Sequence, residues 1–291
     1  MRKALLAALL LPLGAALLPA QGPASSTVHM ALAAKNERVR PALQAEKSTA
    51  VTADGRIWTV EYWWDTTVKN KREMRLYASA DGGQSWKYVT KARSGQASYG
   101  SIATDPDGTT LHVVYQGRPT SVTSYGWSIY YAPFDTTTDQ WAAPDTAILK
   151  AGTGKYGNRS RPNVAVNSRG MVLASGMKSS GWSTYFKIWD GQKWSSETKL
   201  QKGTYSKCPC VLAGPDDCFH FAYQSGGTYT AYYRRYDPMA MAFGSEGEIQ
   251  VQSRISNDMT MALTPGGDIF LGFITSTGSA GANPGSIKVA H

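Results

Sequence analysis

Long apolar runs are absent after the first 20 residues, which excludes a membrane-spanning helix in the rest of the chain. The start itself is different. A basic stretch, Met1–Lys3, is followed by an apolar run interrupted only by Pro12 and Gly14. This pattern is typical of a secretory signal peptide over residues 1–20. We expect cleavage near Ala20, no lipid anchor, and a secreted or periplasmic protein without a membrane partner.

Cysteine is scarce, with three residues, Cys208, Cys210 and Cys218, all close together. Such a low number excludes a scaffold that depends on many disulfides, and a chain of this length can bury a large core without them. Because an exported chain meets an oxidising compartment, one disulfide within the cluster and one remaining thiol are expected. No histidine or carboxylate stands at a typical ligand spacing beside these cysteines, so no metal is expected.

Signatures of cofactor chemistry are also missing. The sequence has no nucleophile elbow, no phosphate-binding glycine loop and no zinc-spaced cluster. The glycine-rich stretch 278–285 precedes no helix and is interpreted as a loop. No cofactor is therefore expected.

Charged residues are sparse and mostly basic. Removing Arg2 and Lys3 from the 30 basic residues leaves 28 against 21 acidic ones, a net charge near +7. This excess fits a soluble surface, or attraction to an anionic partner such as an acidic polysaccharide. Nucleic acid is not expected for an exported protein without a basic run.

The main positive feature is an internal repeat. Five ten-residue segments align without gaps, beginning at Glu46 (EKSTAVTADG), Tyr99 (YGSIATDPDG), Arg161 (RPNVAVNSRG), Cys208 (CPCVLAGPDD) and Asn257 (NDMTMALTPG). Each ends in Gly or Asp, which tolerate the positive φ of a tight turn. An apolar stretch follows each turn, so every unit is predicted to open with a hairpin of two strands, A and B. The turns are 53, 62, 47 and 49 residues apart, the size of a four-stranded propeller blade.

The second half of the first four units repeats as well. An alternating strand C ends in an aspartate, and an aromatic residue that opens strand D follows four to six residues later. The pairs are Asp81 with Trp86, Asp135 with Trp141, Asp190 with Trp194, and Asp237 with Phe243. We expect each aspartate to accept hydrogen bonds from backbone N–H groups of its own turn.

The stretch from Ser79 to Trp86 (SADGGQSW) resembles the Asp-box, or BNR, motif S-x-D-x-G-x-T-W of sialidases and other secreted propellers, with Ser85 in the threonine place. The other units carry degenerate copies. The resemblance implies a sialidase-like β-propeller whose Asp-box residues are structural and lie at the blade periphery. These are Ser79, Asp81, Gly83, Trp86, Asp135, Trp141, Asp190, Trp194 and Asp237.

Residues 21–291 are therefore predicted to form one all-β domain, a five-bladed propeller of four-stranded antiparallel blades. The blades cover roughly 46–95, 96–155, 156–205, 206–253 and 254–291. The fifth unit lacks a strand D, and residues 27–33 are expected to supply it and close the ring. A sixth blade would need a hidden unit, and no sequence for one is found.

In a propeller, the loops entering strand A and the B–C loops share one face around the central channel. On this face we expect Arg38, Arg40, Arg118, Arg161, Trp63, Trp64, Trp127 and Trp182. Guanidinium groups hold carboxylates or sulfates in a bidentate fork, and aromatic faces stack on the apolar faces of sugar rings. The pattern favours an acidic glycan as ligand, and the alternative is that the tryptophans only pack the loops.

Sialidases bind the substrate carboxylate with three arginines and use an aspartate as acid/base and a Tyr–Glu pair as nucleophile. The stretch Glu37–Leu43 (ERVRPAL) resembles the first arginine motif, with an extra arginine before its proline, and Asp65 falls near the expected catalytic position. The usual acidic-x-Arg after the first strand B is missing, and no Tyr–Glu pair stands out. Binding without catalysis is therefore favoured over exo-sialidase activity.

Two enzyme alternatives and one further class remain open. A two-carboxylate glycosidase would use Asp65 and Glu46, with Glu61 and Asp258 as the other well-placed acids. A polysaccharide lyase could use His112 or His220, although both occupy the same slot of strand B, which favours a structural role. A monomeric propeller could also act as a platform for other proteins.

Overall fold

The chain folds almost entirely into β-strands in a computed structural model. It describes residues 39–40, 49–64, 72–92, 95–119, 126–152, 158–201, 206–224, 230–249, 254–264, 266–276 and 287–290. Within these residues the helical content is a single 3-10 turn, η2 (Ser180–Trp182). None of the helical structure described is long or apolar enough to span a bilayer.

The described strands form five antiparallel sheets, which follow one another along the chain. The first contains β1 (Val39–Arg40), β2 (Thr49–Val51), β3 (Ile57–Trp64), β4 (Arg72–Ser79) and β5 (Lys87–Lys91). The second contains β6 (Gln96–Thr104), β7 (Thr110–Arg118), β8 (Ser128–Asp135), β9 (Gln140–Trp141) and β10 (Thr146–Leu149).

The remaining sheets repeat this order. The third contains β11 (Arg159–Val166), β12 (Val172–Lys178), β13 (Ser183–Trp189) and β14 (Thr198–Lys199). The fourth contains β15 (Lys207–Ala213), β16 (Phe219–Gln224), β17 (Ala231–Asp237) and β18 (Ala242–Ile249), and the fifth β19 (Arg254–Leu263), β20 (Ile269–Ser276) and β21 (Ile287–Ala290). The prediction of an all-β protein of four-stranded antiparallel units is confirmed. Residues 27–33 lie outside the described residues.

The A–B turns form where the repeat predicts them, with one correction. Gly55, Gly108, Gly170 and Asp217 each have φ between 60° and 80°, and each donates its N–H to the carbonyl three residues earlier. In the fifth sheet Gly267 (φ 93°), not Gly266, takes this place. The gapless alignment is therefore wrong by one residue in the fifth unit, because β19 carries a longer irregularity between Ile255 and Met259.

The C–D turns are closed by their aspartates, as expected. Asp81 accepts the Ser85 N–H at 2.9 Å and contacts the hydroxyls of Ser79 and Ser85. The aspartates that begin the next three C–D turns accept N–H groups in the same way. Hydrogen bonds, first from the Ser85 hydroxyl, hold the pKa of Asp81 well below its usual range. In the second sheet Trp141 lies in the short β9, and the longer outer strand β10 begins only at Thr146.

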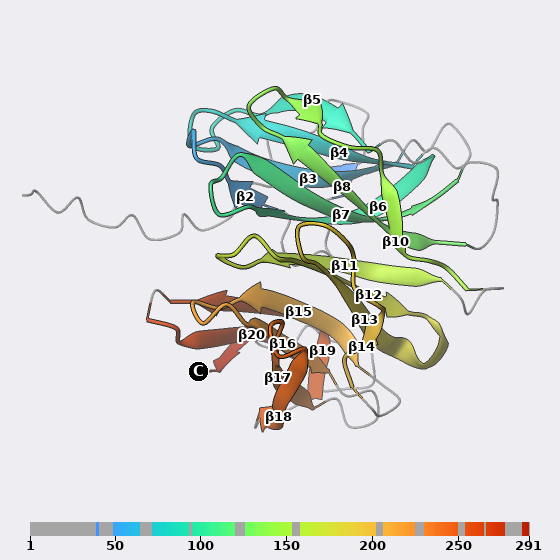
Figure 1. Cartoon of the computed structure of the whole chain (residues 1–291), viewed down its shortest axis with the longest axis vertical. Helices are drawn as coiled ribbons and strands as arrows, with labels where there is room; N and C mark the ends of the chain where they lie inside the picture. Colours follow the sequence, from blue (N-terminus) through green and yellow to red (C-terminus); the bar gives the residue numbers. More distant parts are fainter. Residues whose placement is uncertain are drawn as a thin grey trace, which may run out of the picture.

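Successive sheets meet through their A strands, which places these strands together on one side of the assembly. β6 contacts β3 and β11, and β15 contacts β11 and β19. Figure 1 shows the first two sheets at the top, β11–β14 below them and the fourth and fifth sheets at the bottom. We call the free edges of β6, β11, β15 and β19 the inner edge.

The core is the set of apolar faces between neighbouring sheets. Trp58, Val60 and Leu76 of the first sheet pack with Ile102 and Phe134 of the second. Phe186, Phe221 and Tyr236 fill the space between the third and fourth sheets, with the Phe186 and Phe221 ring centroids 5.3 Å apart. Burial of these large side chains is the dominant stabilisation of the fold.

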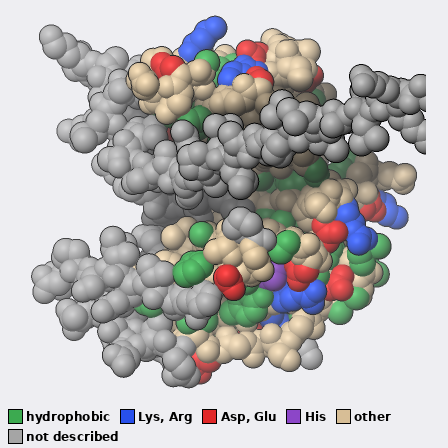
Figure 2. All heavy atoms as spheres, turned by 90° about the vertical axis from the view of Figure 1, so that its left-hand side faces the viewer, with side chains coloured by type: hydrophobic (Ala, Val, Ile, Leu, Met, Phe, Trp, Pro, Cys, Tyr) green, Lys and Arg blue, Asp and Glu red, His purple; other side chains and the backbone are tan. Residues whose placement is uncertain are grey.

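The A–B and C–D turns share one end of the sheets, which we call the turn end. Arg56 of the first A–B turn forms an ion pair at 2.8 Å with Asp139 of the second C–D turn. Asn167 donates to the Asp217 carbonyl at 2.9 Å and so joins the third and fourth A–B turns. Figure 2 shows Lys and Arg side chains interspersed with Asp and Glu on the visible part of the molecule. Among the predicted ligand-binding residues, Arg118, Trp127, Arg161 and Trp182 belong to the opposite end, the B–C end.

A disulfide between Cys210 and Cys218 is not formed. Both residues are buried, and the structure records no bridge between them. Cys210 lies in β15 and pairs with Ala222 of β16, whereas Cys218 lies between the A–B turn and the start of β16. The two cysteines are therefore not opposite each other in the sheet. The side chain of Cys208 lies outside the described residues.

Candidate functional site

Two arginines meet on one tryptophan at the B–C end of the first and second sheets. The Arg118 guanidinium, at the end of β7, lies 4.6 Å from the ring centroid of Trp127, and that of Arg72, at the start of β4, lies 5.9 Å from it. Arg118 donates two hydrogen bonds, of 2.8 and 3.1 Å, to the Gln96 amide oxygen. Its side chain is buried, with 4% of the residue exposed. Among the described residues, no carboxylate pairs with Arg118.

This pair of like charges is unfavourable by itself. Burial and then the nearby Arg72 charge lower the pKa of Arg118. Cation–π contact with Trp127 and the neutral Gln96 amide stabilise the charge only in part. A bound anion would supply a counter-charge to Arg118, so the arrangement is chemically suited to a carboxylate or a sulfate.

The backbone holds Trp127 rigidly in this place. Its N–H and that of Gly126 donate to the Asn158 side-chain oxygen at 3.2 and 2.9 Å. Its carbonyl accepts the Arg159 N–H at 2.7 Å. The Gln116 amide donates to the Arg159 carbonyl at 2.7 Å and so ties the second sheet to the third. The hydrogen bonds that hold Trp127 beneath the two arginines therefore belong to the interface between the second and third sheets.

The third sheet adds two arginines to this end. Arg159 forms an ion pair with Glu197 at 2.7 Å and lies 4.9 Å from the Tyr185 ring, so its charge is already neutralised. Arg161 is partly exposed and has φ of +53° within β11. It lies where two residues of β11, Arg161 and Pro162, oppose the single Gly176 of β12, a β-bulge.

The predicted tryptophans fall into two groups. Trp63 and Trp127 are 7% and 8% exposed, and Trp63 lies under the Arg75 guanidinium at 4.0 Å. Their rings are therefore covered by guanidinium groups and are not open to stack on a sugar. Trp182, at the end of η2, is 44% exposed.

Several predicted residues cannot be placed in the site. Arg38, Glu46 and Asp65 lie outside the described residues. For Arg40 and Trp64 the structure describes only the backbone, in which Arg40 pairs with Tyr62 and Trp64 with Arg72. Sequence reasoning did not single out Arg72, which begins the alternating strand β4 and has no motif around it. Its place directly after the first B–C loop puts it at this end, but nothing in the sequence pairs it with Trp127.

Glu61 is not a loop residue but lies in the middle of β3, opposite Arg75. The corresponding residues of the other strands B are Tyr115, Gly176, Tyr223 and Phe273. Glu61 therefore places a carboxyl group where the other sheets have an uncharged residue. One of its oxygens is buried without a hydrogen-bond partner. Burial raises the pKa of Glu61 to about 7, and a hydrogen bond with Thr59 offsets this only partly.

We therefore expect Glu61→Gln to stabilise the protein at pH 8 and to be neutral at pH 4. Between pH 4.5 and 7 the folded state keeps a proton that the unfolded state releases, so the parent loses stability as pH rises. After discounting for partial exposure, the difference at pH 8 should be on the order of 2 kcal/mol. Urea unfolding of both proteins at each pH measures it. An equal difference at the two pH values would contradict this assignment.

The two histidines are structural. His112 contacts the Tyr131 hydroxyl at 2.8 Å and His220 the Tyr233 hydroxyl at 2.6 Å, in equivalent positions of the second and fourth sheets. Burial lowers the pKa of His112 to about 4, so it is neutral at physiological pH. Both histidine side chains are buried against these tyrosines and do not belong to the B–C end.

A Tyr–Glu pair, absent from the sequence expectation, does occur: Tyr223 donates to Glu246. Tyr115 donates to Asp145 at the equivalent place in the second sheet. Tyr223 is fully buried, and burial first, then the Glu246 contact, raises its pKa. A raised pKa is the opposite of what activates a phenol as a nucleophile, so these repeated pairs support the fold.

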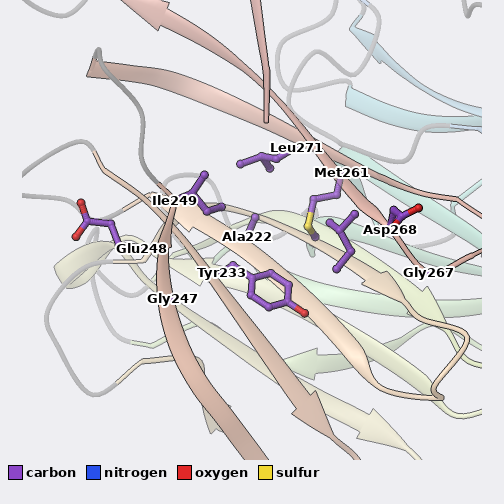
Figure 3. Close-up of a pocket in the computed structure, with 10 residues that line it drawn as sticks. Ala222, Tyr233, Gly247, Glu248, Ile249, Met261, Gly267, Asp268 and Leu271 are labelled. Carbon is purple, nitrogen blue, oxygen red and sulfur yellow. The ribbon is translucent and has the colours of Figure 1, made fainter. Parts of the chain in front are cut away.

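A cavity of about 460 Å³ lies elsewhere, between the fourth and fifth sheets. Figure 3 shows Tyr233, Ile249, Met261 and Leu271 around it. Ala222, which lines it, stands where the first and second sheets have Val60 and Val114. Within the described residues no group of three His, Cys, Asp or Glu side chains could hold a metal ion.

Comparison with known proteins shows the fold and no family. No family model matches, and no curated protein matches. An α-L-arabinofuranosidase from Fusarium graminearum is similar with a TM-score of 0.61 and 15% identity, covering 87% of this chain and 84% of that one. An α-L-arabinanase from Penicillium chrysogenum has a TM-score of 0.56 and 13% identity, covering 85% and 83%.

A Hadza microbial sialidase has a TM-score of 0.58 and 11% identity over 84% of this chain, which spans about half, 55%, of that one. These structures are β-propellers. At such low identity the similarity shows the propeller architecture alone.

Proposed function

We propose that this protein is a secreted, sialidase-like Asp-box propeller that engages extracellular acidic carbohydrate at its B–C end. The observation that carries the proposal is the convergence of Arg118 and Arg72 on Trp127, with no described carboxylate paired to Arg118. Arg161 and the exposed Trp182 lie at the same end. The carbohydrate-directed names of the similar propellers support this reading.

The architecture we propose around this site is a closed ring of five blades within residues 21–291. Residues 27–33 would pair with β21 as the fifth blade's outer strand, so that the inner edge surrounds a channel. Residues 1–20 would be removed on export, and the mature protein would act as a monomer.

Binding without hydrolysis is the form that the described residues favour. In the described Tyr–carboxylate pairs the tyrosines are buried and hydrogen-bonded to Asp145 and Glu246, and Glu61 lies in mid-sheet. A glycosidase using Asp65 and Glu46, or a lyase, is the alternative outcome of the test below.

The test is a glycan array carrying sialylated, uronate-containing and sulfated glycans beside their neutral counterparts. We expect retention of acidic glycans only, weakening between 50 and 500 mM salt because the attraction is electrostatic. Release of sugar from sialosides or uronate polymers, lost on Asp65→Asn, would establish the enzyme alternative. Retention of no acidic glycan at physiological salt would refute the proposal and leave a protein-interaction platform as the better reading.

A further inference from the structure

In the four repeats whose strand A begins within the described residues, the position nine residues before the A–B turn residue lies at an irregularity in strand A. In β6, Ser98 pairs with Gln116 and Gly100 with Tyr115, so Tyr99 is an extra residue. Arg161 lies in the bulge of β11, and the register also shifts around Cys208 in β15 and Asp258 in β19. One repeat position is therefore bulged in four sheets, always on the inner edge.

This position differs chemically from its neighbours. The middle of each repeat is mostly small and apolar, whereas the bulge position holds Tyr99, Arg161, Cys208 and, after the one-residue correction of the fifth unit, Asp258. Tyr99 and Arg161 have φ of +45° and +53°, a region that disfavours any residue with a Cβ. A fold that needed only the bend would be better served by glycine, which is free of this penalty.

Tyr99 forms an aromatic pair across two sheets. Its ring stacks on Tyr62 of β3, with centroids 5.9 Å apart and planes 27° apart. Both side chains are partly exposed, unlike Trp63 and Trp127. Arg161 occupies the equivalent place on the adjoining strand β11, which is joined to β6 by the bond from the Val164 N–H to the Ser101 hydroxyl at 3.3 Å.

We propose that the Tyr62–Tyr99 pair is the platform on which a sugar ring stacks, and that the bulge position determines ligand specificity around the inner edge. This inference rests on the proposed function and deepens it. The apolar C–H face of a pyranose would lie on the Tyr99 ring, and its acidic substituent would point to Arg161. The bulge holds both side chains at one level of neighbouring strands.

The test compares Tyr99→Ala, Tyr99→Gly and Tyr99→Phe with the parent, using sialyllactose, oligogalacturonate and a heparin oligosaccharide as probes in calorimetric titration. Tyr88→Ala, an exposed tyrosine of β5, is the matched control. We expect Ala and Gly to weaken the best-bound probe about tenfold, and Phe and the control to stay within about twofold.

Thermal melting of the same variants separates a ligand role from a structural one. Glycine relieves the positive φ, so Tyr99→Gly should keep or raise the melting temperature while losing affinity. A Gly variant that melts lower and binds normally would overturn the inference and show a structural tyrosine. If Arg118→Met weakens binding and Tyr99→Ala does not, the platform is wrong and the proposed function stands. A parent that binds none of the probes refutes both.

Discussion

Gly176→Val is expected to destabilise the protein by about 3 kcal/mol, because it forces a branched side chain into a filled interface. A Cβ at this position would lie 2.5 Å from Ile129 Cγ1 and 3.1 Å from its Cδ1. Ile129 is fully buried in β8, so it has no room to move. The clash lies where the second sheet packs on the third, and guanidinium chloride unfolding of the purified variant measures its cost.

Two further variants make this prediction specific. Gly247→Ala is the control, since no atom lies within 4 Å of its added Cβ, and it should change stability by less than about 0.5 kcal/mol. Ile129→Ala opens space, so in the double variant the effect of Gly176→Val should shrink markedly. Additive effects of the two substitutions would contradict the packing of these sheets.

Arg118→Met should weaken binding of an acidic glycan about 10- to 100-fold, because methionine keeps an apolar stem against Trp127 and removes the charge. The variant leaves the Gln96 amide oxygen without its two donors, so a modest stability loss accompanies it. The affinity for a neutral counterpart of the same glycan should not change. Titration at low and physiological salt measures both effects.

The matched control for Arg118 is Lys87→Met, which removes one exposed positive charge from the outer strand β5. If general attraction by the basic surface were responsible, both variants would weaken binding equally and slightly. Equal losses would therefore contradict a specific anion site at Trp127. A loss confined to Arg118→Met would support it.

The repeat made the strands predictable from the sequence, because turn residues and apolar spacing are local properties. Gly55, Gly108 and Gly170 take the positive φ that their place in the repeat requires. The fifth turn was misplaced because the extra residue in β19 lies between strands whose pairing is not visible in the sequence. The pairing of the three cysteines was left open for the same reason, since sequence proximity does not reveal that a turn separates Cys210 from Cys218.

The site was less predictable because it depends on contacts between sheets. Arg118 and Trp127 could be assigned to one end from the expected topology. That Trp127 is covered by guanidinium groups, and that Arg72 joins them, follows only from the packing of two sheets. The Tyr62–Tyr99 pair likewise required a bulge that composition does not signal.

The most direct test is a crystal structure of the protein with the acidic oligosaccharide that the array retains most strongly. We predict sugar density at the B–C end of the first three sheets, with its acidic group at Arg118 or Arg161 and a ring over Tyr99. Density at the turn end, or in the cavity beside Tyr233 and Met261, would contradict the account.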